Sequence, residues 1–274
     1  MAQAAASPPA FGALAREARA VHAIWLREVT RFASEPTRIA GALGQPLVYL
    51  VIMGTGFGAT FRAAAAPPTF NYLVFMYPGI LGMTVLFTSL FSAISIIWDR
   101  EFGFLKEILV ARVARSSIVL GKVAGGATVA AIQAVILLLL APLAGVRLGP
   151  LAVVQIALVL LLVAAALTSL GLAIASRMAT MEGFQVIMNF LVVPMWLLSG
   201  AFFPLRGLPW WMDALVRMDP LTYAVDALRG VVYGASPLGA ALVLHPLRVD
   251  LAVVALALGA SFALAIATFR SRED

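Results

Sequence analysis

Six long apolar stretches, separated by short polar segments, dominate the pattern of residues along this chain. Each is long enough to form the helix of about 20 residues that crosses a bilayer. We expect helices, because a helix satisfies its own backbone hydrogen bonds in hydrocarbon, whereas barrel strands would show short alternating segments. The predicted spans are Ile39–Thr60, Tyr72–Ile97, Ser117–Val146, Leu151–Ser176, Gly183–Phe203 and Val249–Phe269.

The segment before the first span is amphipathic and too charged to insert. Apolar residues from Leu14 to Val29 recur at helical spacing, while arginines such as Arg16 and Arg27 occupy much of the remainder. A basic amphipathic helix that contains Trp25 suits the inner membrane interface, and a fully solvated helix is the alternative. We therefore divide the chain into a cytoplasmic N-terminal part, residues 1–38, and a membrane domain, residues 39–274.

The loop after the second span, from Trp98 to Arg112, is charged at its start and amphipathic beyond it. Asp99 and Glu101 favour the beginning of a helix, and Arg112 favours its end, because of the direction of the helix dipole. We expect a short surface helix here. By its residues alone it could be a rigid contact for a cytoplasmic partner or an inert connector.

The loop between the fourth and fifth spans, from Arg177 to Glu182, lies on the same side of the membrane as the loop after the second span and is very short. It forces the fourth and fifth spans into an antiparallel hairpin. The fifth span contains Gln185, Asn189 and Pro194. The simpler interpretation is interhelical hydrogen bonding with a kink at the proline, and a lining of a substrate path is the alternative.

Two short amphipathic helices are predicted between the fifth and sixth spans, over residues 209–216 and 220–233. In the second helix, Asp226 and Arg229 are close enough in sequence to pair. Neither helix is long enough to span, so we expect a re-entrant hairpin in the outer half of the bilayer. Its defining residues are a turn proline, two headgroup-level tryptophans, the N-cap and first residue of the second helix, and a tyrosine: Pro204, Trp210, Trp211, Asp219, Pro220 and Tyr223.

The distribution of Lys and Arg predicts that both termini are cytoplasmic, because cytoplasmic loops carry an excess of these residues. In this orientation thirteen basic residues lie inside and six lie outside. The inside set is Arg16, Arg19, Arg27, Arg31, Arg38, Arg100, Lys106, Arg112, Arg115, Lys122, Arg177, Arg270 and Arg272. The outside set is Arg62, Arg147, Arg206, Arg217, Arg229 and Arg248.

Composition agrees with a membrane protein. Hydrophobic residues make up 62% of the chain and charged residues 12%, with a mean hydropathy of +1.00, whereas soluble domains carry about 25% charged residues. The net charge of +6 does not predict nucleic-acid binding, because the charges fall between the apolar runs. The sequence has no cysteine, and His22 and His245 lie far apart, so we expect no metal site. No apolar signal-peptide region follows the N-terminus, so targeting should rest on the spans.

Missing chemistry narrows the function classes further. The six apolar cores contain no acid or base apart from boundary residues such as Lys122 and Glu182. This disfavours proton-coupled transport and intramembrane enzymes, which need ionisable groups in the membrane. The sequence also lacks the GxxxxGK[ST] phosphate-binding loop. We therefore expect that the chain is not itself an enzyme, and that any uphill transport takes its energy from a partner.

Three passages resemble the ABC-2-type transporter permeases, the group that includes drug-resistance permeases and nodulation lipo-oligosaccharide exporters. The first runs from Tyr77-Pro-Gly through Trp98-Asp-Arg-Glu-Phe-Gly-Phe-Leu-Lys-Glu to Leu120-Gly-Lys. The second is Met181-Glu-Gly-Phe-Gln. The third is Leu198-Ser-Gly-Ala-Phe-Phe-Pro followed by Asp219-Pro-Leu-Thr-Tyr-Ala-Val-Asp-Ala-Leu-Arg. The likeness covers nearly the whole chain in the expected order.

The resemblance implies a six-helix permease that pairs as a dimer, a homodimer or one with a related permease, with one cytoplasmic ABC ATPase subunit on each half. ATP and Mg²⁺ would bind to these two ATPase copies, and the permease itself would need no cofactor. The loop after the second span would be the coupling helix, and the turn after the fourth span a smaller contact. The implied coupling residues are Asp99, Arg100, Glu101, Phe102, Gly103, Leu105, Lys106, Met181 and Glu182.

The substrate is not determined by the sequence, because apolar walls suit drugs, lipids and lipid-linked sugars alike. Candidate pathway residues are Phe87, Phe91, Gln185, Asn189 and Pro194. We see no long aromatic run along the inner helices, and interpret Phe87 and Phe91 as packing residues first. The predicted function is the permease of an exporter in a bacterial inner membrane. The alternatives are a lipid or glycolipid flippase component, and a membrane anchor or assembly subunit that translocates nothing.

Overall fold

The computed structural model describes residues 10–63, 71–102, 113–234, 239 and 242–270, and over these residues it contains helices and no strand. Among the described residues, six helical spans are long and apolar enough to cross a membrane, the second of which runs from Tyr72 to Glu101. This confirms the predicted number. The long helices are α1 (Ala10–Ala33), α2 (Pro36–Ala63), α3 (Tyr72–Ser92), α6 (Arg115–Leu139), α7 (Pro150–Arg177), α8 (Met181–Leu198) and α12 (Leu247–Arg270). The shorter helices are α4 (Ile94–Glu101), α9 (Trp210–Met218) and α10 (Pro220–Tyr233), with a 3₁₀ turn, η1, at Ala141–Ala144.

Two predicted spans are too long at their C-terminal ends. The third was expected to reach Val146, but α6 ends at Leu139 and is followed by η1, which has Pro142 in its first turn and ends at Gly145 with φ +80°. Proline lacks the N–H that would continue the helix. The fifth was expected to reach Phe203, but α8 ends at Leu198 because Gly200 takes a left-handed conformation, φ +80°. Hydropathy did not detect either turn because the residues around it stay apolar.

The centre of the bundle is α3, which packs against α2, α6, α7 and α10. Helix α12 packs along α7, and α1 packs along α6. Helices α2 and α8 leave large apolar side chains on the surface, such as Ile52 and Phe190. These two helices therefore have faces that suit lipid or another protein.

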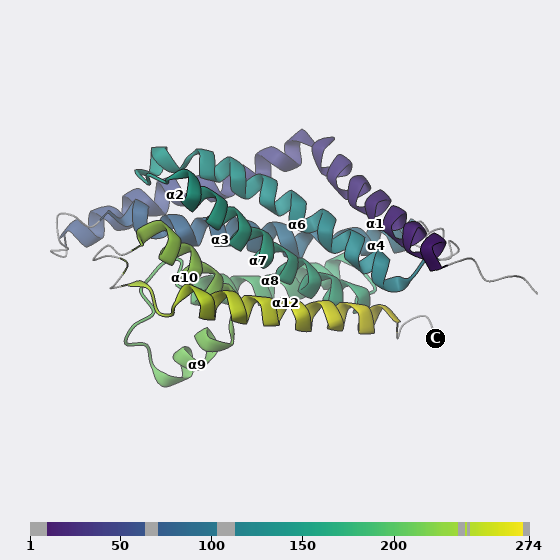
Figure 1. The fold of residues 1–274 in the computed structure, drawn as a ribbon. Coiled ribbons are helices and arrows are strands. Elements are labelled where there is room, and N and C mark those ends of the chain that lie inside the picture. The colour runs from purple at the N-terminus through teal and green to yellow at the C-terminus, as the bar shows by residue number, and fades with distance from the viewer. Residues whose placement is uncertain (1–9, 64–70, 103–112, 235–238, 240–241, 271–274) are drawn as a thin grey trace, which may run out of the picture.

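The two ends of the bundle differ in what they hold (Figure 1). The start of α1, helix α4 and the end of α12 lie together at one end, which we call the α4 end. Helices α9 and α10 lie at the opposite end, the α10 end. The predicted cap of α10 is confirmed, because the Asp219 side chain accepts a hydrogen bond from the Leu221 N–H at 2.9 Å. Helix α10 is buried among α12, α7 and α3, whereas α9 exposes Trp210.

Candidate functional site

Four charged side chains from three helices form a cluster at the α4 end, two of them buried and two half-buried. This ionic cluster consists of Arg27 and Glu28 from α1, Asp99 from α4 and Lys122 from α6. The Lys122 ammonium donates to Glu28 at 2.8 Å and also to Asp99, and Arg27 donates to the same Asp99 oxygen at 2.6 Å. Ser95 accepts the third Lys122 hydrogen bond at 3.0 Å. The two positive and two negative formal charges cancel, as buried charges require.

A pair of glycines lets α1 approach α6 closely enough to form this cluster. A Cβ atom on Gly121 would lie 2.8 Å from the Ile24 Cβ, and one on Gly125 would lie 2.6 Å from the Glu28 Cβ. These glycines form a GxxxG motif, whose small residues allow two helix backbones to come together in a membrane protein. The motif therefore places Glu28 beside Lys122.

Helix α1 also contacts both sides of the segment that we expected to be the coupling helix. On the near side, Arg27 binds Asp99, and the Arg31 guanidinium lies 4.2 Å from the centre of the Trp98 ring. On the far side, the Glu17 carboxylate accepts a hydrogen bond from the Ala114 N–H at 2.9 Å. Helix α1 thus contacts the 98–114 segment on both sides of residues 103–112.

A second set of contacts joins α4 to the turn between α7 and α8. Arg100 donates to the carbonyl of Met178 at 2.7 Å and to that of Ser176 at 3.2 Å. These carbonyls end α7, where the helix dipole favours a positive charge. The Trp98 indole N–H donates to the Met181 sulfur. The end of α4 and the turn between α7 and α8, at which the resemblance implied two coupling contacts, therefore lie side by side and are joined directly.

The predicted coupling residues separate into two groups. Asp99 is buried and Arg100 is half-buried, and both bind to the rest of the bundle. Glu101, Phe102 and Glu182 are exposed, and Phe102 is 82% exposed. The first group can position the segment, and the second can contact a partner. Met181 is half-buried and accepts the Trp98 hydrogen bond. Gly103, Leu105 and Lys106 lie outside the described residues.

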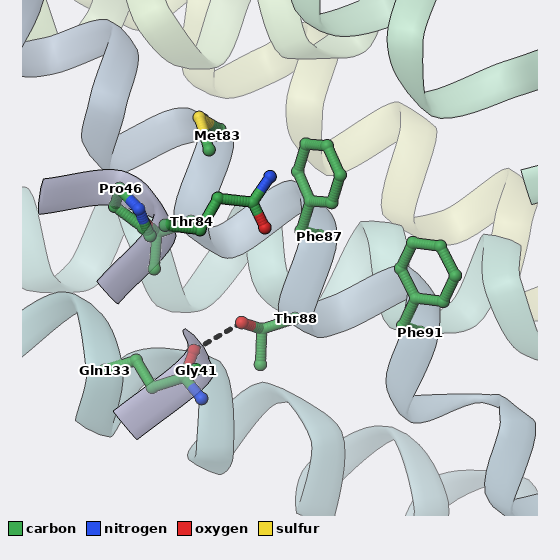
Figure 2. A pocket seen from close by; sticks show the side chains of 9 residues that line it. Gly41, Pro46, Met83, Thr84, Phe87, Thr88, Phe91 and Gln133 are labelled. Atoms are coloured by element: carbon green, nitrogen blue, oxygen red, sulfur yellow. Dashed lines mark hydrogen bonds between the residues drawn. The ribbon is translucent and has the colours of Figure 1, made fainter. Parts of the chain in front are cut away.

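A cavity of about 440 Å³ opens on the side of the bundle between α2, α3 and α6. Figure 2 shows that Phe87 and Phe91 line it from neighbouring turns of α3. Thr88 donates a hydrogen bond to the Gln133 side-chain oxygen at one wall. The complete lining is Gly41, Gln45, Pro46, Met83, Thr84, Phe87, Thr88, Phe91 and Gln133. The lining is mostly apolar with a few polar groups, as in sites for amphipathic molecules.

A row of aromatic rings runs beside this cavity. Phe87 and Phe91 stack with centroids 6.2 Å apart, and Phe184 of α8 meets Phe91 edge-on at 6.4 Å. Trp196 of α8 meets Phe87 at 6.0 Å and Tyr49 of α2 at 5.0 Å. The sequence showed no long aromatic run along the inner helices, and we therefore did not expect such a row. The row arises because α2, α3 and α8 each contribute rings.

The other three candidate pathway residues do not share the cavity. Gln185, Asn189 and Pro194 are exposed on α8. Asn189 and Pro194 line a separate, shallow apolar groove together with Phe190. The structure therefore divides the predicted pathway set into two α3 residues at the cavity and three residues on the outward face of α8.

The residues predicted to define the re-entrant segment between α8 and α12 also differ in their exposure. Pro204, Trp210 and Trp211 are exposed, whereas Asp219 is buried at the start of α10. The Tyr223 hydroxyl donates to the Arg217 carbonyl at 3.1 Å. Pro220 is the first residue of α10, as expected.

The Asp226–Arg229 pair expected within α10 is replaced by other partners. Arg229 is fully buried, donates to the Gly200 carbonyl, and lies over the Phe75 ring at 4.8 Å. Asp226 instead accepts hydrogen bonds from the N–H groups of Leu244 and His245. The two residues therefore connect α10 to two different loops.

Sequence reasoning missed the ionic cluster because its members lie far apart in the chain. Lys122 was interpreted as a boundary residue, although it is only 4% exposed. The GxxxG motif at Gly121 and Gly125 was the available signal, because it predicts a close helix contact beside Lys122. No comparable motif indicates the partners of Asp226.

The six spans indicate a multi-pass membrane protein, and at the α4 end hydrogen bonds connect α4 to the end of α7. A profile of the family described as ABC-2 type transporter matches residues 19–233, and the chain belongs to this family. The transport permease ycf38 of Cyanophora paradoxa is 33% identical over 196 residues, which are 70% of this chain and 67% of the relative.

Two bacterial relatives agree with this assignment. Nodulation protein J of Rhizobium meliloti strain 1021 is 29% identical over 212 residues, which are 73% of this chain and 75% of the relative. The inner membrane transport permease YadH of Escherichia coli K12 is 26% identical over 216 residues, 77% of this chain and 81% of the relative.

Proposed function

We propose that this chain is the permease subunit of an ATP-binding cassette exporter in a bacterial cytoplasmic membrane. A separate cytoplasmic ATPase would bind and hydrolyse ATP, and the permease would move an amphipathic, lipid-like or glycan substrate outward. The observation that carries the proposal is the attachment of the 98–114 segment to α1, α6 and the α7–α8 turn.

The attachment matters because force can pass only through a rigid connection. The ionic cluster fixes α4 to α1 and α6, and Arg100 fixes it to the end of α7. A push on the exposed side of this segment would therefore move several spans together. Such rigid-body movement is how packed helices switch between two arrangements.

The proposed orientation places the α4 end in the cytoplasm, in agreement with the excess of Lys and Arg there. Helix α1 then lies at the inner interface. The α9–α10 pair becomes an outer re-entrant hairpin, with Trp210 and Trp211 exposed at the level of the headgroups.

The cavity and the row of rings support an amphipathic cargo. The cavity opens between α2 and α3, and α2 and α8 are among the helices that leave large apolar side chains exposed. A second copy of the permease would cover these faces and close the cavity into a pathway between the copies. The proposed assembly is a homodimer with two ATPase copies.

The test is purification of the tagged chain in mild detergent from its native host, followed by identification and quantification of co-purifying proteins. We expect one ABC ATPase per permease and vanadate-sensitive ATP hydrolysis. Phe102→Ala should lower ATPase recovery at least about tenfold if this exposed ring is an anchor of the interface, because loss of an anchor residue costs about 2 kcal/mol or more.

Leu143→Ala is the matched control, because Leu143 is 84% exposed but lies next to α6 at the other end of the bundle. This variant should retain the ATPase. Recovery of the wild-type chain alone under several gentle conditions would contradict the proposal and favour the anchor function. Equal retention by both variants would exclude Phe102 from the interface.

A further inference from the structure

Three potential metal-binding side chains converge at the α10 end. Asp226 comes from α10, His245 from the loop before α12, and Asp250 from the first turn of α12. One ligand atom from each lies within 4.8 Å of those from the other two. The His245 Nδ1 atom lies 3.4 Å from an Asp226 oxygen and 3.6 Å from an Asp250 oxygen.

Hydrogen bonds do not account for the position of Asp250 beside the imidazole. Both distances exceed the 2.7–3.2 Å that is usual for a nitrogen–oxygen hydrogen bond. Among the described residues, neither oxygen of Asp250 nor the His245 Nδ1 atom has a hydrogen-bond partner. The Asp250 side chain is 1% exposed and faces the imidazole. A buried carboxylate in this position is costly unless another group binds it.

From this geometry we propose that Asp226, His245 and Asp250 bind a divalent transition-metal ion of the zinc type. An ion that binds ligands at about 2.0–2.1 Å in a tetrahedral arrangement separates their atoms by roughly 3.3–3.4 Å, close to the spacing of His245 Nδ1 and its two neighbours. One imidazole with two carboxylates is a donor set that suits Zn²⁺. Mg²⁺ and Ca²⁺ prefer oxygen ligands only.

The surroundings hold two of the ligands in place. The N–H groups of Leu244 and His245 donate to Asp226 at 2.8–2.9 Å, which fixes the carboxylate beside the imidazole. The Tyr223 ring stacks on His245 at 5.2 Å. Outer contacts of this sort orient the ligands of protein metal sites.

A small cavity lies beside the imidazole. Its volume is about 190 Å³, and Tyr223, Leu244 and His245 are among the residues that line it. His245 is the proposed ligand that lines it, so we expect the ion and a water ligand to approach from the side of the imidazole. A bound ion would tie α10 to the start of α12, and so join the two helices across the loop between them.

The test measures zinc on the purified full-length chain in detergent, after dialysis against a chelator and then against buffered Zn²⁺. We expect one Zn²⁺ per wild-type chain by elemental analysis. Asp250→Asn and His245→Gln should each weaken Zn²⁺ binding at least about 100-fold, because even an outer contact of a metal site is worth about 10- to 100-fold. Co²⁺ in place of Zn²⁺ should give the visible spectrum of a tetrahedral ion.

His22→Gln is the matched control, because it removes the other histidine of the chain, which is exposed on α1. This variant should bind one Zn²⁺ as the wild type does. Absence of Zn²⁺ from the wild type, or equal Zn²⁺ in all four proteins, would overturn the proposal. Size-exclusion profiles of the variants distinguish a lost ligand from a misfolded chain. The assay requires neither ATPase nor transport, so it is independent of the proposed function.

Discussion

The two ends of the bundle differ in whether their buried charged groups have partners within the chain. At the α4 end, Lys122 and Arg27 each bind Asp99, and the formal charges of the ionic cluster cancel. At the α10 end, Asp226 and Asp250 face one histidine at 3.4 and 3.6 Å, and Asp250 has no hydrogen-bond partner among the described residues. In the first cluster every charged group has a partner from the chain itself, whereas in the second Asp250 has none among the described residues.

This difference indicates different roles. A buried cluster in which every charge has a partner holds its helices in one arrangement, and it gains little from any further ligand. A cluster with an unpartnered buried acid is expected to bind something that the chain does not supply. We therefore assign positioning to the α4 end and binding to the α10 end, and the predictions below test this division.

The largest expected effect comes from breaking the ionic cluster. Lys122→Met removes the cation that lies between Glu28 and Asp99 and leaves these two acids with Arg27 alone. Loss of one member of a buried ion pair costs about 3–5 kcal/mol of unfolding free energy. Unfolding of the purified chain in mixed micelles with increasing sodium dodecyl sulfate measures this loss.

Two further variants test whether the loss of stability in Lys122→Met is caused by the unpaired charges. Addition of Asp99→Asn to Lys122→Met should recover much of the stability, because Arg27 and Glu28 then remain as a neutral pair. Arg217→Met breaks an ion pair on α9 whose arginine is 73% exposed, and it should cost less than about 1 kcal/mol. An equal loss in Lys122→Met and Arg217→Met would contradict the positioning role.

A smaller effect is expected from moving α1 without changing any charge. A side chain at Gly125 meets Glu28, so Gly125→Val forces α1 away from α6 and stretches the ionic cluster. Overpacking of this kind costs about 1–3 kcal/mol. The same unfolding assay measures it, and ATPase activity in the intact complex shows whether coupling is lost together with stability.

Gly56→Val is the control for this substitution. Gly56 lies on α2, and a Cβ atom there has no neighbour within 4 Å. The change should alter the unfolding free energy by less than about 0.5 kcal/mol. If both valine variants behave alike, the close approach of α1 and α6 does not depend on the GxxxG motif.

The spans were predictable because the thickness of the bilayer sets the length of an apolar run. Their ends at Leu139 and Leu198 were not, since the turns that follow are apolar too. The cap of α10 was predictable because Asp219 and Pro220 are adjacent in the chain. Local patterns thus gave the elements and their caps.

The buried clusters depend on tertiary contacts and escaped prediction. Lys122 lies 94 residues from Glu28 and 23 from Asp99 along the chain. His245 was set aside because the second histidine is distant, but its neighbours are carboxylates. Pathway aromatics were sought along single helices, whereas the row beside the cavity is shared among three. Which faces of the helices pack against each other could not be predicted from the sequence.

The smallest effect concerns a third buried acid at the α10 end, Asp219, which lies between the fifth and sixth spans. Burial raises the pKa of Asp219 to about 7, although hydrogen bonds from the Leu221 N–H and the Thr222 hydroxyl oppose the shift. The folded chain therefore binds a proton that the unfolded chain releases near pH 4. The resulting stabilisation is complete below about pH 4 and is lost as the pH rises towards 7.

One linked proton limits the slope to about 1.4 kcal/mol per pH unit. Thermal unfolding between pH 5 and pH 8 should show a fall in the wild type that Asp219→Asn reduces, because asparagine remains an N-cap but does not titrate in this range. The unfolding temperature of the variant should therefore rise relative to the wild type as the pH increases. A constant difference between the two would mean that Asp219 is charged throughout, and that the α10 end tolerates a buried acid without a proton or an ion.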